Sequence, residues 1–470
     1  MRSSTRRNFL KSSAIAAASV AAFNGKFLWA APAGGVQAWM TSKNKKFEKT
    51  AAPQWRATAS NASAAIQLDP AKRYQKILGF GAAFTDASCY LFGKLNEQER
   101  RALLTEFFGP SGLRMSVCRT CIGASDYSTS AYSFDESPEP DPQLKKFSID
   151  HDRAYILPTL RAAREINPEL FLFSSPWSPP GWMKAGNSLL GGSMRKEYFA
   201  PYANYFVKFL QGYSDAGVKI NAVTVQNEVD TDQNGRMPAA LWGQEYEIEF
   251  VKSHLGPALE HASPDTKIWI LDHNYNLWGR AEDELSDPDL YKYVDGVAWH
   301  GYFGDVSSMT RVHDAFPAKN AYWTEGGPDY TSPDYQTDWA KWSHTYSEVL
   351  RNWARCIVGW NLILDENGKP DIGPFSCGGV VTVNSKTHAL TRSGQYWAVA
   401  HYSKMIERGA QVIGSHGELK DISHVAFENP DGRRVLVLTN QGGEQQISCQ
   451  AGNQAMDLTL EPDSVMTLLL

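Results

Sequence analysis

The sequence has no excess of positive charge. Its 46 Lys and Arg residues are outnumbered by 51 Asp and Glu residues, which gives a net charge of −5 at pH 7 over 470 residues. This balance provides no basic face for nucleic acid or anionic lipid, so we expect neither as a partner. Beyond residue 33 no segment approaches the roughly 20 apolar residues that a membrane-spanning helix needs, so we expect no permanent membrane anchor.

Cysteine and histidine are scarce, with six and eleven residues. Cys118 and Cys121 form a CxxC pair, but it lies inside an apolar run without a second pair or a nearby histidine. This context favours buried thiols over a zinc or redox site. The first apolar run of the main domain carries no histidine, which argues against a metal-dependent hydrolase on the same fold. We therefore expect neither a metal nor a cofactor.

The N-terminus carries a targeting pattern. Residues 5–11 read TRRNFLK and are followed by an apolar stretch over 14–23 and by Ala31-Pro32-Ala33, which suits a signal peptidase. This predicts a twin-arginine signal over residues 1–33, recognised by the twin-arginine export machinery, and a periplasmic or secreted protein. Residues 34–60 are small, polar and basic, which predicts a linker.

Residues 77–408 alternate apolar runs with amphipathic helical stretches. The runs are short and apolar on both faces, as in parallel strands covered by helices, and the connections are too long for hairpins. Eight such units predict an α/β fold, the (β/α)8 TIM barrel. A doubly wound open sheet is the alternative, but no Gly-rich phosphate-binding motif follows the first run. The eight runs are Ile77–Thr85, Leu113–Cys121, Leu170–Pro176, Ile220–Glu228, Lys267–His273, Gly296–Tyr302, Asn320–Gly327 and Cys356–Ile363.

Residues 409–470 change character. Short alternating runs, such as Arg434–Thr439 and Ser464–Leu469, are separated by Gly, Asn and Asp turns. This pattern predicts a small antiparallel β-sandwich domain, to which residues 61–76 lend an N-terminal strand. The clearest helices of the barrel are expected over Asn96–Phe108, Asp150–Ile166, Glu197–Ala216, Trp339–Cys356 and Gln395–Arg408.

In such a barrel, the carboxyl ends of the strands carry the chemistry. All eight predicted ends present polar or aromatic residues, and Glu228 and Glu325 end the fourth and seventh strands. These strands face each other across the barrel mouth, as glycoside hydrolysis requires: one carboxyl donates a proton and the other attacks the anomeric carbon. Asp86 and Asp126 are an alternative pair, but Asp126 lies in a loop, and we expect both of them to bind substrate.

Six motifs, in their order and spacing, resemble glycoside hydrolase family 30, the family of glucosylceramidase. The resemblance extends from about Ile77 to the C-terminus, and it implies a barrel with a small β-domain built from both chain ends. The motifs are GFGAAFTDAS (79–88), SSPWSPPGWM (174–183), VTVQNE (223–228), VAWHGY (297–302), YWTEGG (322–327) and VGWNL (358–362).

The resemblance also implies a retaining enzyme with Glu228 as the acid/base and Glu325 as the nucleophile. Two departures bear on the choice of aglycone or linkage. Val229 stands where the family usually has proline, and a tryptophan and an acid that usually precede the strand-8 tryptophan are missing. The sugar-binding residues implied are Asp126, Trp177, Asn227, Tyr302 and Trp360, supported by Arg119, His300 and Trp323.

The sequence leaves the substrate open. A glucosylceramidase-like or β-glucosidase-like activity on a β-linked glycoside or oligosaccharide is the main hypothesis. The same mechanism on β-1,6-glucans, xylans, fucosides or galactans is the alternative. A non-catalytic barrel that binds polysaccharide is a different class of function, and the presence of both Glu228 and Glu325 argues against it.

Overall fold

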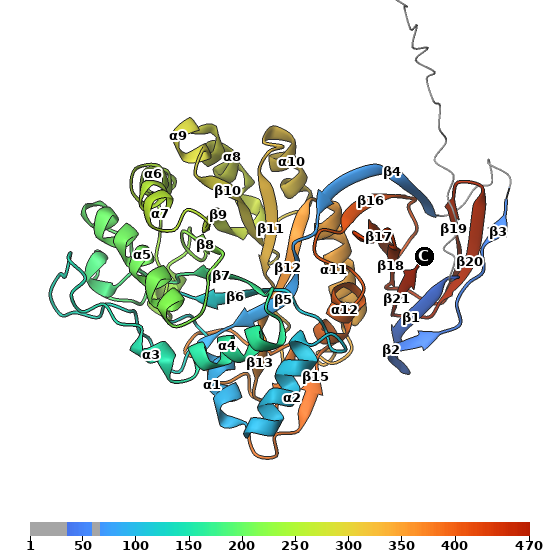
Figure 1. Cartoon of the computed structure of the whole chain (residues 1–470), viewed down its shortest axis with the longest axis horizontal. Helices are drawn as coiled ribbons and strands as arrows, with labels where there is room; N and C mark the ends of the chain where they lie inside the picture. The colour runs from blue at the N-terminus through green and yellow to red at the C-terminus, as the bar shows by residue number, and fades with distance from the viewer. Residues whose placement is uncertain (1–34, 59–65) are drawn as a thin grey trace, which may run out of the picture.

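The computed structural model describes residues 35–58 and 66–470, so the predicted twin-arginine signal lies outside the described residues. The larger unit is a closed barrel of eight parallel strands, which confirms the predicted fold (Figure 1). The last strand, β12, pairs with the first, β5, and closes the barrel. The strands are β5 (Gly79–Phe84), β6 (Val117–Cys121), β7 (Phe171–Ser175), β8 (Ala222–Thr224), β9 (Lys267–Asn274), β10 (Val294–His300), β11 (Asn320–Glu325) and β12 (Ala354–Asn361).

Side chains fill the interior of the barrel. Trp269 of β9 stacks on Tyr322 of β11 with ring centroids 3.9 Å apart, and it also contacts Phe173 of β7. Buried Val117, Ala222, Ala298, Cys356 and Val358 complete this cluster. Because bulky side chains plug the barrel, a ligand has to bind at one end of it rather than inside it.

Helices cover the outside of the barrel (Figure 1). The predicted helix over Asp150–Ile166 is interrupted at Tyr155, which has a φ of −150°. At this interruption the Tyr155 hydroxyl donates a hydrogen bond to the buried carboxylate of Asp86. The helices are α1 (Asp86–Lys94), α2 (Glu97–Phe108), α3 (Asp150–Arg153), α4 (Ile156–Ile166), α5 (Phe199–Asp215), α6 (Gln244–Phe250), α7 (Gly256–Ala262), α8 (Trp278–Ser286), α9 (Pro288–Tyr291), α10 (Ser307–Ala315), α11 (Trp339–Arg351) and α12 (Gly394–Ser403).

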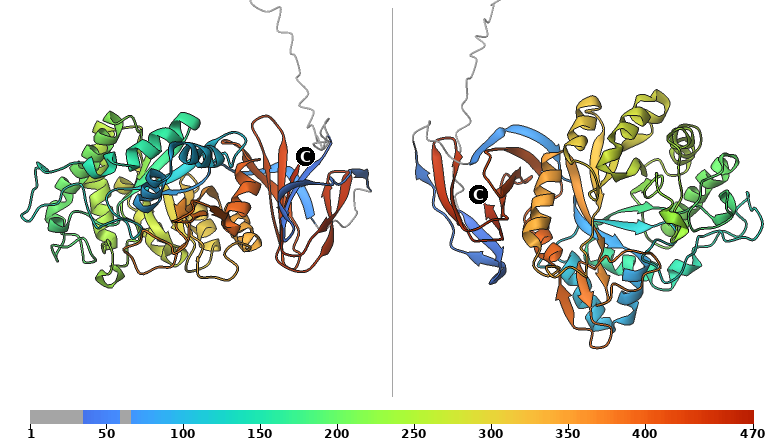
Figure 2. Two further views of the ribbon diagram at one scale, coloured as in Figure 1. Left: turned by 90° about the horizontal axis from the view of Figure 1, so that it is seen from below. Right: turned by 180° about the vertical axis from the view of Figure 1, so that it is seen from behind.

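The second unit is a ten-stranded, mainly antiparallel sheet that lies beside the barrel (Figure 2). Its register shifts along β4 and β16, where the sheet curves, and its buried side chains form a core of their own. This is the predicted β-sandwich. In spatial order the strands are β2 (Lys45–Thr50), β1 (Gln37–Ser42), β21 (Ser464–Leu469), β18 (Arg434–Asn440), β17 (Ile422–Glu428), β16 (Gln411–His416), β4 (Ile66–Lys76), β19 (Gln445–Ala451), β20 (Gln454–Leu460) and β3 (Arg56–Ala57).

The predicted linker over residues 34–60 is wrong for the part of it that the structure describes. β1 lies between β2 and β21, and its Ala38 and Met40 are buried in the sandwich core. β2 is an edge strand with three lysines among its six residues. Edge strands commonly carry lysine because charge discourages pairing with other chains. The same composition made this segment resemble a linker.

A small third sheet was not predicted. It consists of β13 (Ile363–Leu364), β14 (Val381–Val383) and β15 (Leu390–Arg392), and it is inserted between β12 and α12. Strands of two or three residues are too short to show an alternating pattern. The loop between β13 and β14 brings Phe375 and Cys377 to the mouth of the barrel.

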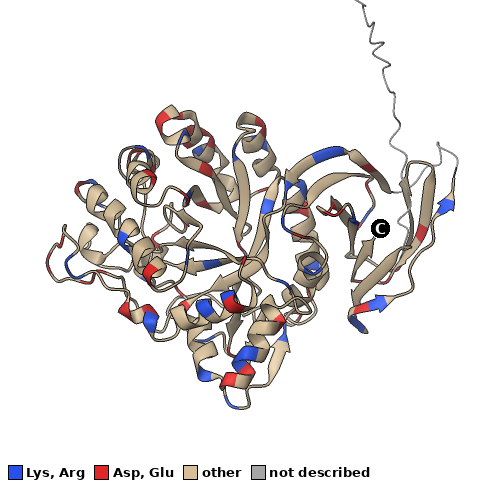
Figure 3. Cartoon of the chain, viewed as in Figure 1, with Lys and Arg blue, Asp and Glu red and all other residues tan. Residues whose placement is uncertain are grey.

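Acidic and basic residues are interspersed along the helices and strands of the described chain (Figure 3). Among the described residues, the search for a helix with the length and hydropathy to cross a membrane found none. All six cysteines are free thiols. Cys118 and Cys121 are buried in β6, which confirms the prediction of buried thiols for this pair.

His401 of α12 connects the barrel to the sandwich. Its Nδ1 lies 2.8 Å from the hydroxyl of Thr467 in β21, and its Nε2 lies 2.8 Å from the hydroxyl of Thr41 in β1. The side chain is completely buried, and burial lowers the pKa of His401 to about 3. The neutral imidazole therefore holds two strands of the sandwich against the barrel.

Acidification is expected to weaken this contact. The pKa of an unfolded histidine is about 6.5, so the contribution of His401 to stability is complete above that pH. It is lost progressively as the pH falls toward 3, at a cost of roughly 2 kcal/mol between pH 7 and pH 5. His401→Gln cannot be protonated, so its free energy of unfolding in urea should fall less over this range. The titration of His424 is common to both proteins and cancels in the comparison. An equal loss of the free energy of unfolding in both proteins would therefore contradict the assignment to His401.

Candidate active site

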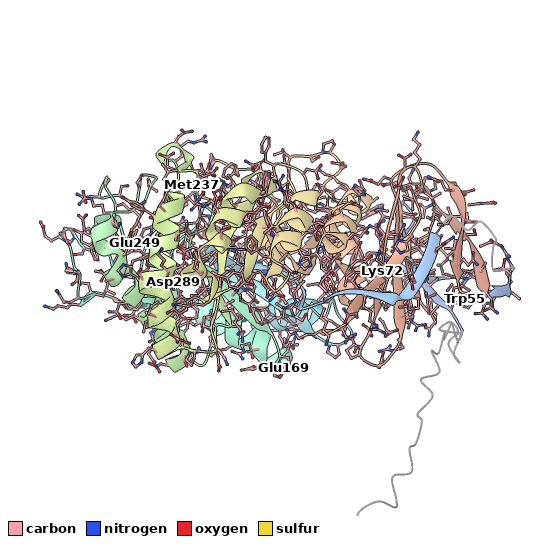
Figure 4. All side chains as sticks on the ribbon, turned by 90° about the horizontal axis from the view of Figure 1, so that it is seen from above. Trp55, Lys72, Glu169, Met237, Glu249 and Asp289 are labelled. Atoms are coloured by element: carbon pink, nitrogen blue, oxygen red, sulfur yellow. The ribbon has the colours of Figure 1, made fainter. Side chains whose placement is uncertain are left out.

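A cavity of about 450 Å³ opens among residues at and beyond the carboxyl ends of the barrel strands. It contains the two predicted glutamates and five predicted sugar-binding residues. Met237, labelled in Figure 4, lines the cavity from the long segment after β8. The seven predicted residues in the cavity wall are Asp126, Trp177, Asn227, Glu228, Tyr302, Glu325 and Trp360.

Glu325 ends β11 and is 6% exposed. Its Oε2 accepts a hydrogen bond from Arg119 Nη1 at 2.5 Å, and its Oε1 accepts one from the Tyr302 hydroxyl at 3.0 Å. Donors on both oxygens fix the carboxylate and favour its ionised form. A Cβ on the next residue, Gly326, would lie 2.2 Å from the ring of Trp323, so glycine is required for this approach.

Arg119 is the centre of a polar network beneath the cavity. Besides Glu325, its guanidinium donates to Asn227 Oδ1 at 2.8 Å, to Asp272 Oδ2 at 2.7 Å and to the Ser175 hydroxyl at 3.1 Å. Arg119 and Asp272 are both completely buried. Buried charges that are paired and fully hydrogen-bonded define a rigid arrangement. The network therefore fixes Glu325 and Asn227 relative to each other.

Asp272 enters this network through a strained bulge of β9. Leu271 and Asp272 have φ angles of 69° and 48°, in the left-handed region that non-glycine residues rarely adopt. The Leu271 N–H donates to the buried carboxylate of Glu247 at 3.2 Å, and the Asp272 carbonyl accepts from the Glu228 N–H at 3.1 Å. Both contacts stabilise the bulge, which is the kind of strain found at functional sites.

Glu228 follows β8 and also has a left-handed backbone, with a φ of 55°. Its Oε2 accepts a hydrogen bond from Gln233 at 2.9 Å. Its Oε1 lies 3.4 Å from His300 Nδ1 and 3.6 Å from His273 Nδ1. The other nitrogen of His300 lies 3.9 Å from Glu325 Oε2. One imidazole ring is therefore interposed between the two glutamates.

The pKa values of Glu228, His300 and Glu325 are set by burial and by neighbouring charges. Burial raises the pKa of Glu325 despite the opposing charges of His300 and Arg119. Burial alone would also raise the pKa of Glu228, but the imidazoles of His300 and His273 lower it overall. Burial alone would lower the pKa of His300, but the charge of Glu325 and the bond to Asp272 raise it to about 9. In the free protein, His300 is therefore a cation between the two glutamates.

The aromatic side of the cavity consists of Trp177 and Trp360, whose stacked rings have centroids 5.1 Å apart. Arg119 lies 4.6 Å from the Trp177 ring and supports it from below. Near them, Asp126 has a buried Oδ1 without a hydrogen-bond partner. Burial and the charge of Glu325 raise the pKa of Asp126. An unpartnered carboxyl oxygen beside indole rings is suited to bind a hydroxyl of a sugar whose apolar face contacts the rings.

Three predicted residues lie beneath the cavity wall. Arg119 and His300 are completely buried and contact the glutamates as described. The indole of Trp323 donates to the Tyr275 hydroxyl at 2.8 Å and packs under Gly326. None of the three lines the cavity, and their supporting role stays a prediction.

The prediction that Asp86 binds substrate is wrong. Its carboxylate lies 2.6 Å from His151 Nε2, accepts a hydrogen bond from the Tyr155 hydroxyl and also accepts one from the Thr129 N–H. Asp86 is in the first turn of α1, which Thr85 caps. That turn directs its side chain toward the segment of α3 and α4 rather than into the cavity.

Several residues of the site were not predicted from the sequence. Asp272 and His273 were at a predicted strand end, and this position was the signal that could have identified them. Gln233 lies five residues beyond Glu228 in an irregular segment and carried no signal. Phe375 and Cys377 also line the cavity, from a loop without a periodic pattern.

Comparisons with known proteins agree with this geometry. The family model described as the glycosyl hydrolase family 30 TIM-barrel domain matches residues 77–406, and that of the family 30 beta sandwich domain matches residues 409–468. An endo-1,6-beta-D-glucanase of Neurospora crassa is 33% identical over 407 residues, which are 82% of this chain and 83% of that protein.

A second relative is the lysosomal acid glucosylceramidase of Mus musculus, 30% identical over 400 residues, which are 81% of this chain and 78% of that protein. Among solved structures, the endo-beta1,6-glucanase BT3312 has a TM-score of 0.83 and 29% identity, and the match covers 92% of this chain and 99% of that one. With the two family models covering most of the sequence, the chain belongs to glycosyl hydrolase family 30 and is a glycoside hydrolase.

Proposed function

We propose that the protein cleaves β-linked glucosides by double displacement, with Glu325 as the nucleophile and Glu228 as the acid/base. The observation that carries this proposal is the pair of glutamates in one cavity, Glu228 beyond the end of β8 and Glu325 at the end of β11, with His300 between them. Two carboxyl groups of different environment that flank one bond are what a retaining mechanism uses.

In the first step, Glu325 attacks the anomeric carbon and the bond from this carbon to the leaving oxygen breaks. Arg119 and Tyr302 hold the Glu325 carboxylate oriented for this attack, and the charge of Arg119 opposes the burial that raises the pKa of Glu325. Glu228 has to be protonated for this step, against the lowered pKa that it has in the free protein, and it gives this proton to the leaving oxygen. In the second step, Glu228 takes a proton from water, and the oxygen of that water displaces Glu325 from the anomeric carbon.

For the substrate, we propose a β-1,6-linked glucan or its oligosaccharides. An endo-1,6-glucanase is present both among the similar sequences and among the similar structures. Glucosylceramide is the second candidate because the mouse relative is a glucosylceramidase. Phe303 and Phe375, which are 67% and 41% exposed, provide apolar surface near the cavity for either a second sugar or a lipid.

A linkage screen tests this proposal. We expect release of glucose or short oligosaccharides from β-1,6-glucan, weaker cleavage of β-1,3- and β-1,4-linked glucans, and no cleavage of α-glucosides. Glucosylceramide in detergent micelles is the comparison that distinguishes the two candidates. Proton NMR of the first product should show the β anomer, because two displacements retain configuration. Initial formation of the α anomer would contradict the double displacement.

A further inference from the structure

Three potential ligand atoms converge in the wall of the cavity. They are Glu228 Oε1, His273 Nδ1 and His300 Nδ1, and all lie within 4.8 Å of one another. Both histidine rings are more than nine-tenths buried, and both Nδ1 atoms face Glu228 Oε1, at 3.4 Å from His300 and 3.6 Å from His273. Without a bound ion, the His300 cation is paired with the Glu228 carboxylate. A metal ion that displaces the His300 proton would bind all three atoms at once.

The opposite side of each imidazole is bound to a carboxylate. His273 Nε2 lies 2.6 Å from Asp230 Oδ1, and His300 Nε2 lies 3.1 Å from Asp272 Oδ1. Histidines that bind metals almost always donate their other ring N–H to such a partner, which fixes the tautomer and makes the free nitrogen a better ligand. Both rings therefore have the orientation of metal ligands, and binding of the ion would release the Nδ1 proton of the His300 cation.

The spacing also suits a small ion. With metal–ligand bonds of about 2.0–2.1 Å, the ligand atoms of a tetrahedral zinc site lie roughly 3.3 Å apart. Glu228 Oε1 is 3.4 Å from His300 Nδ1 and 3.6 Å from His273 Nδ1. The third separation, between the two nitrogens, is at most 4.8 Å and would need to shorten by roughly 1.5 Å at most. Glu228 and His273 both line the cavity, so a fourth ligand position faces solvent.

We propose that Glu228, His273 and His300 form a binding site for one Zn²⁺ ion, or for a divalent ion that prefers the same ligands, and that this ion inhibits the enzyme. Two imidazoles and one carboxylate with an open position are a donor set that zinc, copper and nickel accept, whereas magnesium and calcium prefer oxygen ligands. The metal binding itself is independent of the proposed function. The inhibition rests on the proposed function, because a metal on Glu228 prevents proton transfer to the leaving oxygen.

Equilibrium dialysis of the full chain against Zn²⁺, after removal of metal with a chelator, tests the site directly. We expect one Zn²⁺ per chain at saturation. His273→Asn removes a ligand and should weaken binding more than tenfold. Asp230→Asn removes only the partner of His273 and should weaken binding by roughly 10–100-fold. Asp230 is 43% exposed, so this variant is expected to fold. Co²⁺ at the site should give the visible absorption of a four-coordinate ion.

Two control variants distinguish this site from other zinc ligands. His261→Asn removes an exposed histidine of α7, and Cys377→Ser removes the thiol that lines the same cavity. Neither should change the stoichiometry or the affinity. The proposal is overturned if Zn²⁺ does not bind saturably, if His273→Asn and Asp230→Asn bind as the parent does, or if Cys377→Ser abolishes binding.

Activity separates the two parts of the proposal. Zn²⁺ should lower kcat/KM for a disaccharide in proportion to site occupancy, and a chelator should restore it. If the ion binds at one equivalent and the variants respond as expected, but disaccharide hydrolysis is unchanged, then the role of Glu228 as acid is wrong and the inhibition is overturned. Failure of the dialysis experiment, with hydrolysis intact, overturns the metal site alone.

Discussion

Glu325→Ala is expected to lose almost all turnover, by about 10⁴-fold or more, because no covalent intermediate can form without the nucleophile. The loss should apply to substrates with good and poor leaving groups alike. Arg119 and Tyr302 hold the Glu325 carboxylate from both oxygens, so no neighbouring carboxylate is equally well placed to attack. Steady-state kinetics on an aryl β-glucoside and on a β-linked disaccharide provide the measurement.

A 2-fluoro glycoside with an activated leaving group gives a second, positive test of Glu325. The fluorine slows breakdown of the covalent intermediate, so the label accumulates and peptide mass spectrometry can locate it. Glu228→Ala is the matched control, because an activated leaving group needs little protonation and labelling of Glu325 should persist. A label on Asp126 or on Asp272 would refute the assignment of the nucleophile.

The second large effect is expected for Glu228→Ala, and it should depend on the leaving group. General acid catalysis contributes typically 10²–10⁴-fold. A disaccharide has a poor leaving group and should lose roughly that factor in kcat/KM. The dinitrophenolate of a dinitrophenyl glycoside leaves without protonation, so kcat/KM for this substrate should fall much less. The ratio of kcat/KM for the two substrates, measured in the same variant, does not depend on the amount of folded protein.

Azide should rescue the Glu228→Ala variant on the activated substrate. The anion is small enough to enter the space of the deleted carboxylate, and it attacks the intermediate on Glu325 without a base. The product is then a β-glycosyl azide, detectable by chromatography. If Glu228 were only a structural residue of the loop after β8, every substrate would be impaired equally and azide would have no effect.

The barrel could be predicted because its strands are fully buried. β5 and β6 are buried along their whole length; β5 shows an uninterrupted apolar or small-residue run, and the run of β6 is interrupted by Arg119 and Thr120. Glu325 directly ends its strand. Glu228 lies four residues beyond Thr224, the last residue of β8 in the structure, yet the predicted strand reached it because the apolar alternation of Val223 and Val225 continues past that residue.

The rest of the site could not be predicted because it depends on tertiary contacts. The bulge at Leu271 exists because Glu247, from a different element, accepts its N–H. Successive side chains of a regular strand point to opposite faces of the sheet. The sequence alone does not show the bulge, so the regular alternation would place Asp272 on the opposite face from the one that it occupies. The edge strand β2 resembled a linker because its lysines are solvent-exposed or half-exposed, and only its pairing with β1 reveals it as a strand.

The sandwich joins both ends of the chain, and this has a consequence for the order of folding during synthesis. β1 pairs with β21, and Ser42 and Glu461, which are 419 residues apart in sequence, share a hydrogen bond. β1 can pair with β2 early, but the ribosome must release nearly the whole polypeptide before β1 can acquire β21, its second partner. Until then, Ala38 and Met40 have no core to enter, and nascent chains present them to chaperones or to other chains. A stop codon before β21 would leave the hairpin of β1 and β2 without its neighbour in the sheet, on an otherwise complete barrel.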